Sequence, residues 1–241
     1  MRVRLLGRFG AVWGEWAVVD GLQGRGSQPW SPSGRVRFWG VTRDAVAPHP
    51  LAALGAGPRR PVLTGVVFLV TLGCGVAQLV HRPLYELVVR DAARIDDGEW
   101  YRLVTGMFFQ DGWTAGLVVN LVWLAVVGTA AERVFGRGRW LVLYFGCGLF
   151  GQFVSYVWLN PVGAGNSMCS AGLLGALAVV VMVASRRYGV EFPKNLRMSA
   201  FVVPVLAVIG TVLHDNHGLP CLLGMALGLL LLPPPARTTQ P

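Results

Sequence analysis

Charged residues are scarce in this chain. Asp, Glu, Lys and Arg make up only 14% of its 241 residues, whereas apolar residues make up 54%. A soluble domain usually carries about a quarter of charged residues, most of them on its surface. Uncharged apolar runs of about 20 residues are instead long enough to cross the ~30 Å hydrocarbon core of a bilayer. The composition therefore excludes an ordinary soluble protein and predicts a multi-pass membrane protein.

Cysteine and histidine are also few, with four of each. The cysteines form no C-x-x-C pair and lie near no histidine cluster, so neither a zinc site nor a disulfide framework is predicted. They fall within or at the ends of apolar runs, where we expect them to be small packing residues: Cys74, Cys147, Cys169 and Cys221.

Six apolar segments are predicted to cross the membrane, and they give an all-α fold. The spans are 62–80, 113–131, 140–159, 167–184, 200–213 and 217–232. They form a membrane domain over 61–232, with a short tail over 233–241. A long first loop over 82–112 mixes charges with aromatic pieces, which predicts an interfacial and partly helical hairpin.

The first 60 residues show neither helical nor strand periodicity. They are rich in Gly, Arg and Pro, which predicts a basic and mostly disordered tail. The alternative is contact with the lipid interface through the tryptophans next to its arginines. Those tryptophans are Trp13, Trp16, Trp30 and Trp39.

The net charge of +9 is explained by the orientation of the chain in the membrane. Of the 21 basic residues, only Arg82, Arg90, Arg94 and Arg102 fall in segments that lie outside when the N-terminus is inside. Basic residues concentrate in cytoplasmic segments of membrane proteins. The pattern predicts that both termini are cytoplasmic in a cell membrane, and no nucleic-acid partner is needed to explain the charge.

With this orientation, the second, fourth and sixth spans all start on the outer side. Ser167 and His217 stand at the outer starts of the fourth and sixth spans, and Asn120 lies about 10 Å into the second. Polar residues inside membranes usually face the bundle or a cavity. We therefore expect these three side chains to lie at a similar depth and to act together.

The fourth span begins with a hydroxyl directly after the glycine-rich segment 163–166. A helix start offers free N–H groups and a positive dipole, where an oxyanion can be stabilised. With 18 residues and about 27 Å, the predicted helix is slightly short for the hydrocarbon core, so we expect its serine end below the membrane surface. Gly172 and Gly175 on this span, and Gly224 and Gly228 on the sixth, allow close helix approach.

These motifs resemble the rhomboid family of intramembrane serine proteases over residues 61–232. Gly165-Asn166-Ser167 followed by Gly172 is similar to the family's nucleophile motif, and His217 followed by Gly224 and Gly228 is similar to its sixth-span histidine motif. Further matches, in chain order, are Trp100-Tyr101-Arg102 in the first loop, Asn120 of H-x-x-x-N, Glu132 with Gly136 at the second-span exit, and Asp215-Asn216.

Four positions depart from the family pattern. The histidine of H-x-x-x-N is Gly116, the glycine after the serine is Met168, the aromatic residue four after it is Ala171, and the glycine three after the histidine is Pro220. Loss of one oxyanion donor typically costs about 10²–10³ in rate, and loss of the nucleophile about 10⁶. The departures therefore predict a weakened or substrate-narrowed enzyme, with Met168 expected to crowd the carbonyl beside Ser167.

The resemblance implies a Ser–His dyad. Ser167 is the implied nucleophile and His217 the general base, while the Ser167 N–H and the Asn120 amide hold the oxyanion. The implied substrates are transmembrane helices of other membrane proteins, and neither a metal nor an organic cofactor is implied. The alternatives are a non-catalytic rhomboid-like protein that binds transmembrane clients and, less in keeping with the uncharged spans, a transporter.

Each residue also has a plainer interpretation. Ser167 alone resembles a helix N-cap, and Asn120 alone resembles interhelical glue worth about 0.6–2 kcal/mol. Ser170 and His214 are nearby residues of the same types that lack the glycine spacing.

Overall fold

The computed structural model describes residues 60–232 and Pro234 of the chain. The tail predicted over residues 1–60 therefore lies outside the described residues except for Arg60, as do the interfacial tryptophans proposed within it and nearly all of 233–241. The division of the chain at these two boundaries stays a prediction. The described residues are mostly helical, with one pair of two-residue strands.

Helix α2 (Val62–Val80) coincides with the first predicted span. Pro61 precedes it, and Pro83 begins the next helix three residues after α2 ends. The face that α2 buries is made largely of small and polar residues, while most of its large apolar residues are exposed. The buried residues are Thr64, Val67, Thr71, Gly75 and Gln78. This pattern suits a helix whose outer face meets lipid and whose inner face makes specific contacts.

The second and third spans form one nearly continuous helical stretch. It consists of α6 (Trp113–Trp123), the π-helical turn η2 (Leu124–Gly128), α7 (Thr129–Val154) and a second π-helical turn η3 (Ser155–Leu159). The sequence predicted a loop over 132–139, but helix continues there and breaks only at Gly136, with φ 75° and ψ 170°. That backbone conformation is accessible essentially to glycine alone, so a single residue separates the two spans.

The last three helices are α8 (Ser167–Tyr188), α9 (Lys194–Val212) and α10 (Gly218–Leu230). Helix α8 has 22 residues, one turn more than predicted. The expectation of a short fourth helix is wrong, because the chain stays helical until Gly189, which has a positive φ of 64°. Helix α9 begins six residues before its predicted start, directly after Pro193. Helix α10 has 13 residues, a length of about 20 Å.

The first loop is partly helical, as predicted. It contains α3 (Pro83–Val88), β1 (Arg90–Asp91), α4 (Ala92–Asp96) and α5 (Arg102–Thr105). Strand β1 pairs antiparallel with β2 (Val162–Gly163), which the sequence did not predict. Because β2 lies just before α8, this pairing anchors the loop to the entrance of the helix that carries Ser167.

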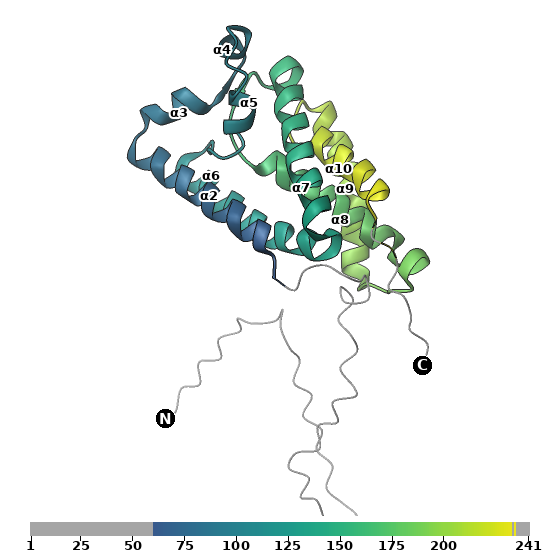
Figure 1. Ribbon diagram of the computed structural model, residues 1–241. Coiled ribbons are helices and arrows are strands. Elements are labelled where there is room, and N and C mark those ends of the chain that lie inside the picture. The colour runs from purple at the N-terminus through teal and green to yellow at the C-terminus, as the bar shows by residue number, and fades with distance from the viewer. Residues whose placement is uncertain (1–59, 233, 235–241) are drawn as a thin grey trace, which may run out of the picture. The chain divides into compact units, whose positions relative to one another are not determined.

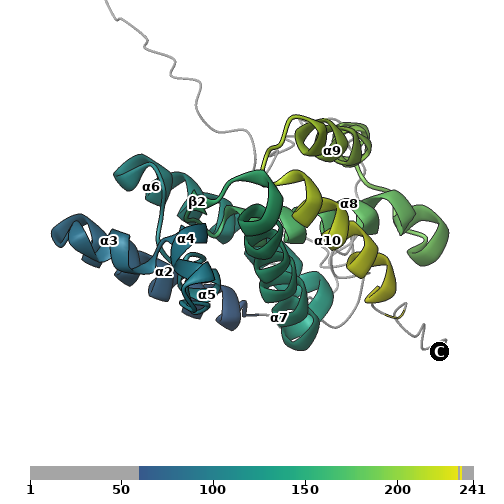
Figure 2. The same cartoon turned by 90° about the horizontal axis from the view of Figure 1, so that it is seen from above.

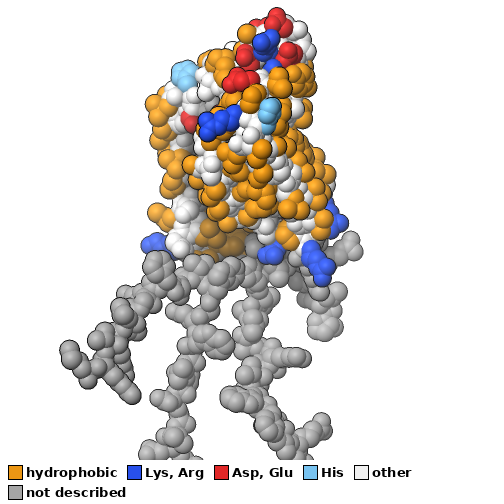
Figure 3. All heavy atoms as spheres, turned by 90° about the vertical axis from the view of Figure 1, so that its left-hand side faces the viewer, with side chains coloured by type: hydrophobic (Ala, Val, Ile, Leu, Met, Phe, Trp, Pro, Cys, Tyr) orange, Lys and Arg blue, Asp and Glu red, His pale blue; other side chains and the backbone are white. Residues whose placement is uncertain are grey.

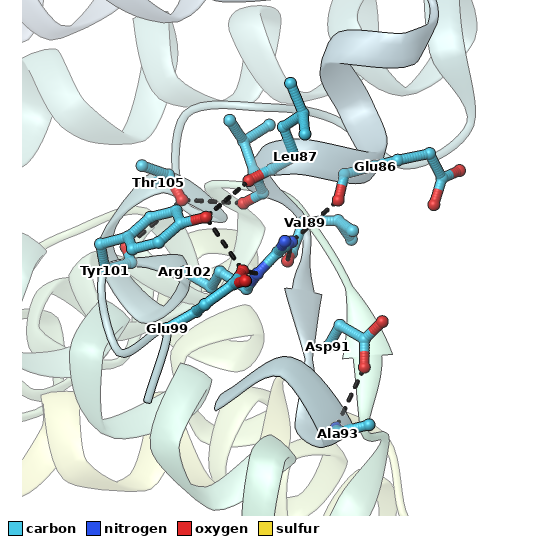
Figure 4. Close-up of polar contacts among 10 residues, drawn as sticks. Glu86, Leu87, Val89, Asp91, Ala93, Glu99, Tyr101, Arg102 and Thr105 are labelled. Atoms are coloured by element: carbon cyan, nitrogen blue, oxygen red, sulfur yellow. Dashed lines mark hydrogen bonds and ion pairs between the residues drawn. The ribbon is translucent and has the colours of Figure 1, made fainter. Parts of the chain in front are cut away.

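A buried arginine holds the first loop together (Figure 4). Arg102 is 3% exposed; its Nε donates to Glu99 Oε2 at 2.6 Å, and its Nη1 donates to the Glu86 and Val89 carbonyls, each at 2.9 Å. The Tyr101 hydroxyl donates to the same Glu99 carboxylate. The hydrogen bond from Arg102 is the main cause that holds the pKa of Glu99 below its usual value. These bonds fold the loop over the α3–β1 junction.

On the face drawn in Figure 3, hydrophobic side chains cover a broad band, with charged residues towards its two ends. Among the described residues, α2, the 47-residue stretch 113–159, α8 and α9 are long and apolar enough to cross a membrane. The 47-residue stretch can cross twice because it breaks at Gly136, and the shorter α10 completes the bundle. The protein is a multi-pass membrane protein that sits in a lipid bilayer.

Helix α8 lies at the centre of the bundle. It packs against α7, α9 and α10. Of its apolar segment, 67% is buried inside the protein, against 11% for the apolar segment of α9. Figure 2 shows α9 at the periphery, and both Figures 1 and 2 show it on the opposite side of α7 from the first-loop helices α3, α4 and α5. The helix with Ser167 is thus supported from several sides.

Candidate active site

Ser167 is the first residue of α8 and is half-buried. The chain reaches it through Gly165, whose φ of 144° is rarely available to other residues, and through the fully buried Asn166. As the first helical residue, Ser167 has a backbone N–H without an intrahelical partner. The hydroxyl and this N–H lie together at the start of the central helix.

Helices α8 and α10 approach each other closely, as the glycine spacing predicted. A methyl group built on Gly224 would lie 2.0 Å from the Gly172 carbonyl oxygen, and one built on Gly175 would lie 2.1 Å from the Cys221 carbonyl oxygen. Backbone therefore meets backbone along this contact. The approach brings the start of α10 next to the start of α8.

His217 stands directly before α10 and contacts Ser167. Its Nε2 lies 2.9 Å from Ser167 Oγ, although the two residues are 50 positions apart in the sequence. This distance is that of a good hydrogen bond. The structure thus brings together the two residues whose meeting the sequence required.

A carboxylate faces the other ring nitrogen of His217. Asp215 Oδ1 and Oδ2 lie 2.9 and 3.1 Å from His217 Nδ1, and Oδ1 also accepts the His217 backbone N–H at 2.8 Å. A carboxylate next to Nδ1 favours the tautomer with the proton on Nδ1. Nε2 then has a free lone pair for the Ser167 hydroxyl proton. Sequence reasoning assigned Asp215 no role beyond its place in the motif.

Asn120 lies on α6 and faces the same small space as Ser167. A methyl group built on Gly165 would lie 3.5 Å from Ser167 Oγ and 3.6 Å from Asn120 Nδ2. Asn120 Nδ2 donates one hydrogen bond to Gln110 Oε1 at 2.6 Å. An amide nitrogen has two protons, so its second N–H is available for a group bound beside Ser167.

Two glutamines that sequence reasoning missed support Asn120. The Gln110 N–H donates to Gln78 Oε1 at 3.0 Å, and Gln78 Nε2 donates to the Gln110 carbonyl at 2.8 Å. Both side chains are 1% exposed. The first span therefore fixes the backbone of Gln110, whose side chain in turn orients Asn120. The sequence signal that could have identified these two residues is an uncharged amide within or next to an apolar segment.

A polar cavity of about 170 Å³ opens beside Ser167 and His217. Its lining includes both residues, Asn120 and groups from the first loop: Arg90, Asp111, Asn120, Ala164, Ser167, Met168, Asn216 and His217. A polar cavity of this size has room for water molecules. Water can therefore reach the hydroxyl of Ser167.

Arg90 contributes a buried cation to this cavity. Its guanidinium donates to the Asn160 carbonyl, with an Nη2 distance of 2.9 Å, and to Gln152. Burial lowers the pKa of Arg90 to about 10, which leaves it protonated at neutral pH. The neighbouring Asp111 accepts from the Tyr85 hydroxyl and from the Ala164 N–H. Sequence reasoning counted Arg90 only as a loop charge.

A second cavity, of about 240 Å³, lies on another side of His217, between α8, α9 and α10. Apart from His217 and Asp215, its lining is apolar: Ala171, Leu174, Val203, Leu206, Ala207, Gly218 and Cys221. His217 thus separates a polar space from an apolar one.

Two of the departures from the family pattern share one contact. A methyl group built on Gly151 of α7 would lie 2.9 Å from Met168 Sδ and 2.7 Å from Pro220 Cγ. Met168 Sδ also lies 3.8 Å from Ser155 Oγ. Although Met168 lines the polar cavity, its thioether packs towards α7. Gly151 therefore leaves room for both Met168 and Pro220.

A third departure, Gly116, has a local cause. A methyl group built on Gly116 would lie 1.8 Å from the Asp111 carbonyl oxygen, so the loop occupies the space that a histidine at this position needs. The nearby Ser170 is buried, and the His214 ring lies 5.4 Å from the Trp158 ring. Neither side chain takes part in the Ser167–His217 contact.

Comparison with known proteins gives consistent matches. A family model described as the rhomboid domain matches residues 97–234. The rhomboid protease GluP of Bacillus subtilis (strain 168) is 39% identical over 93 residues, which are 39% of this chain and 18% of GluP. The candidate rhomboid protease YdcA of the same organism is 29% identical over 140 residues, which are 57% of this chain and 68% of YdcA. The matched stretch thus covers less than a fifth of the length of GluP.

Proposed function

This chain belongs to the rhomboid family, and on that premise we propose that it is an intramembrane serine endopeptidase that cleaves transmembrane segments of other membrane proteins. The observation that carries the proposal is the 2.9 Å contact between Ser167 Oγ and His217 Nε2 beside a polar cavity. A hydroxyl is a weak nucleophile until a base within hydrogen-bond reach takes its proton.

The first half of the reaction forms an acyl-enzyme. His217 Nε2 takes the proton of Ser167 as Oγ attacks the scissile carbonyl carbon. The tetrahedral oxyanion accepts hydrogen bonds from the Ser167 backbone N–H and from Asn120 Nδ2. As the C–N bond breaks, His217 returns the proton to the leaving amine, and the acyl group stays on Ser167 as an ester.

The second half consumes a water molecule, which the polar cavity can supply. His217 takes a proton from the water as its oxygen attacks the ester carbonyl. The same two donors hold the second oxyanion. The C–O bond to Ser167 then breaks, the serine oxygen regains a proton from His217, and the new carboxylic acid leaves.

The orientation in the membrane is part of the proposal. Basic side chains gather at one end of the helices, next to the starts of α2 and α9 (Figure 3). Cytoplasmic segments of membrane proteins are the ones richest in Lys and Arg, so we assign this end to the cytoplasmic side. Ser167 and His217 then work towards the outer side of a cell membrane. A single cysteine placed at Asp97 should react with an impermeant maleimide in intact cells, and one placed at Arg187 should not; the reverse pattern would contradict the orientation.

A second function is favoured by the geometry at Gly116. The loop leaves no space for a histidine there, so the site has one oxyanion donor fewer than the family pattern. A protein that binds transmembrane clients without cutting them needs no oxyanion donors. This binding function is the alternative that the decisive experiment must separate from catalysis.

A fluorophosphonate probe makes that separation in membranes that contain the full chain. Wild type and Ser170→Ala should be labelled, whereas Ser167→Ala should not. The buried Ser170 is the matched control, since it lies on the same helix one turn away. His217→Ala should be labelled only at a slow residual rate while His214→Ala keeps the wild-type rate, and cleavage of a transmembrane reporter should follow the same order. Folded wild type without labelling or cleavage would support client binding instead.

A further inference from the structure

The segment before α10 joins three side chains in one line of hydrogen bonds. Asp215 faces His217 Nδ1 through both carboxylate oxygens, at 2.9 and 3.1 Å. The opposite ring nitrogen, Nε2, lies 2.9 Å from Ser167 Oγ. The order is carboxylate, imidazole, hydroxyl, and each contact has hydrogen-bond length.

We infer that Asp215 is the positioning residue of His217, so that the base works as the middle member of a Ser167–His217–Asp215 triad rather than of a dyad. The inference rests on the proposed endopeptidase function and deepens it. Asp215 does not touch the substrate; it acts through the orientation and the charge of His217.

The carboxylate fixes both the backbone and the ring of His217. Oδ1 accepts the His217 N–H at 2.8 Å, two residues along the chain, which is the bond of an Asx-turn. The Asp215 N–H itself donates to the Gly210 carbonyl of α9 at 2.8 Å. This bond fixes the backbone of Asp215 against the end of α9. The carboxylate in turn determines the orientation of the His217 ring at the start of α10.

His217 needs such support because its side chain is 47% exposed. A neutral imidazole in an open position can carry its proton on either nitrogen and can rotate about its side-chain torsions. A carboxylate at Nδ1 selects the tautomer whose Nε2 accepts the serine proton. It also stabilises the imidazolium that forms when that proton arrives.

The other charged groups near the His217 ring do not replace Asp215 as the partner of Nδ1. The polar cavity brings Arg90 from β1 and Asp111 from the segment before α6, and these two carry opposite charges. The apolar cavity adds only the thiol of Cys221 from α10 among titratable groups other than the pair itself. Asn120 and Asn216 are neutral. Among the described residues, Asp215 is the anion in direct contact with His217.

The test compares Asp215→Asn with Asp215→Glu and with the matched control Asp97→Asn. Asn keeps an oxygen for the His217 N–H but removes the charge, and Asp97 is an exposed carboxylate of the first loop. We expect Asp215→Asn to lower kcat on a transmembrane reporter by about 10- to 10³-fold with KM unchanged, below the ~10⁴ of buried triad aspartates, because water can partly replace a half-exposed carboxylate. Asp215→Glu should recover part of the loss, and Asp97→Asn should match wild type.

A double variant separates positioning from a merely structural role. If Asp215 acts through His217, adding Asp215→Asn to His217→Ala should not lower the residual fluorophosphonate labelling further. An equal loss in both backgrounds, together with a lower thermal midpoint, would overturn the inference. Wild-type rates in Asp215→Asn would overturn it too, while leaving the endopeptidase proposal intact. Absence of Ser167 labelling in wild type would remove both proposals.

Discussion

Helix α2 touches two polar clusters near its opposite ends, and they differ in what their hydrogen bonds leave unused. Near its start, the fully buried Glu132 accepts from the Leu63 N–H at 3.0 Å, the Thr64 N–H at 2.7 Å and the Thr64 hydroxyl at 2.8 Å. A helix start has free N–H donors, and this carboxylate satisfies them. No cavity adjoins Glu132 among those found in the described part of the chain.

Near the other end of α2, Gln78 supports a cluster with unused donors. Asn120 has a second amide proton beyond its bond to Gln110, and Ser167 has a free backbone N–H. Both Asn120 and Ser167 line the polar cavity. The comparison separates two kinds of buried polar group: a saturated cluster stabilises the fold, whereas unused donors beside water can stabilise a reacting group.

The largest effect is expected at the α8–α10 contact, which brings Ser167 and His217 together. Gly224→Ala places a carbon 2.0 Å from the Gly172 carbonyl oxygen, so the two helices must separate. Overpacking costs about 1–3 kcal/mol or more, and a displacement of 1 Å between reacting groups can cost about 10² in rate. Both the thermal midpoint and the rate of fluorophosphonate labelling should fall.

Gly146→Ala is the matched control for this change. Gly146 lies on α7 with no heavy atom within 4 Å of a built methyl group. It should therefore keep the wild-type midpoint and labelling rate. Wild-type behaviour of Gly224→Ala would show that the two helices are not in backbone contact.

Asn120→Ala should affect chemistry and spare the fold. Removal of one oxyanion donor costs about 2.7–4 kcal/mol in the transition state, or 10²–10³ in kcat. The reporter assay should show that loss with a thermal midpoint near that of wild type, because Asn120 is only half-buried and its partner Gln110 keeps its bonds to Gln78. Val119→Ala, an exposed neighbour on α6, serves as the control. A large fall in midpoint with unchanged kcat would place Asn120 in the structural class.

Much of this arrangement was predictable because the signals are local. Apolar runs give the spans, and α2 matches its predicted range, since flanking prolines and charges mark its ends. Glycines spaced along the fourth and sixth spans predicted the α8–α10 approach, and this approach brings Ser167 and His217 into contact. The boundaries that failed, around Gly136, after Ala184 and before Ala200, depend on whether a polar residue next to a span stays helical.

The rest depends on contacts between distant segments. Gln78 meets the backbone of Gln110, and Arg90 reaches Asn160, 70 positions away, through side chains whose partners no local pattern reveals. The pairing of β1 with β2 involves two residues on each side, too few for a periodic signal. Asp215 lies only two residues before His217, yet its role depends on which way the ring points. These features appear only once the helices are packed.

Glu132→Gln is expected to have the smallest effect of the three changes and the opposite character to Asn120→Ala. An amide retains one acceptor oxygen but turns an N–H₂ group towards the donors at the start of α2, so buried N–H groups lose their partner at a cost of about 1–3 kcal/mol. The control is Glu191→Gln: Glu191 pairs with Arg197 at 3.1 Å on the surface, and such pairs contribute about 0–1 kcal/mol. The thermal midpoint should therefore fall in Glu132→Gln and hold in Glu191→Gln. Labelling of Ser167 below the midpoint should stay within a few-fold of wild type in both, because the far end of α2 keeps its Gln78–Gln110 bonds. If kcat fell with Glu132→Gln while the midpoint did not, saturation of hydrogen bonds would no longer distinguish a structural cluster from a reactive one.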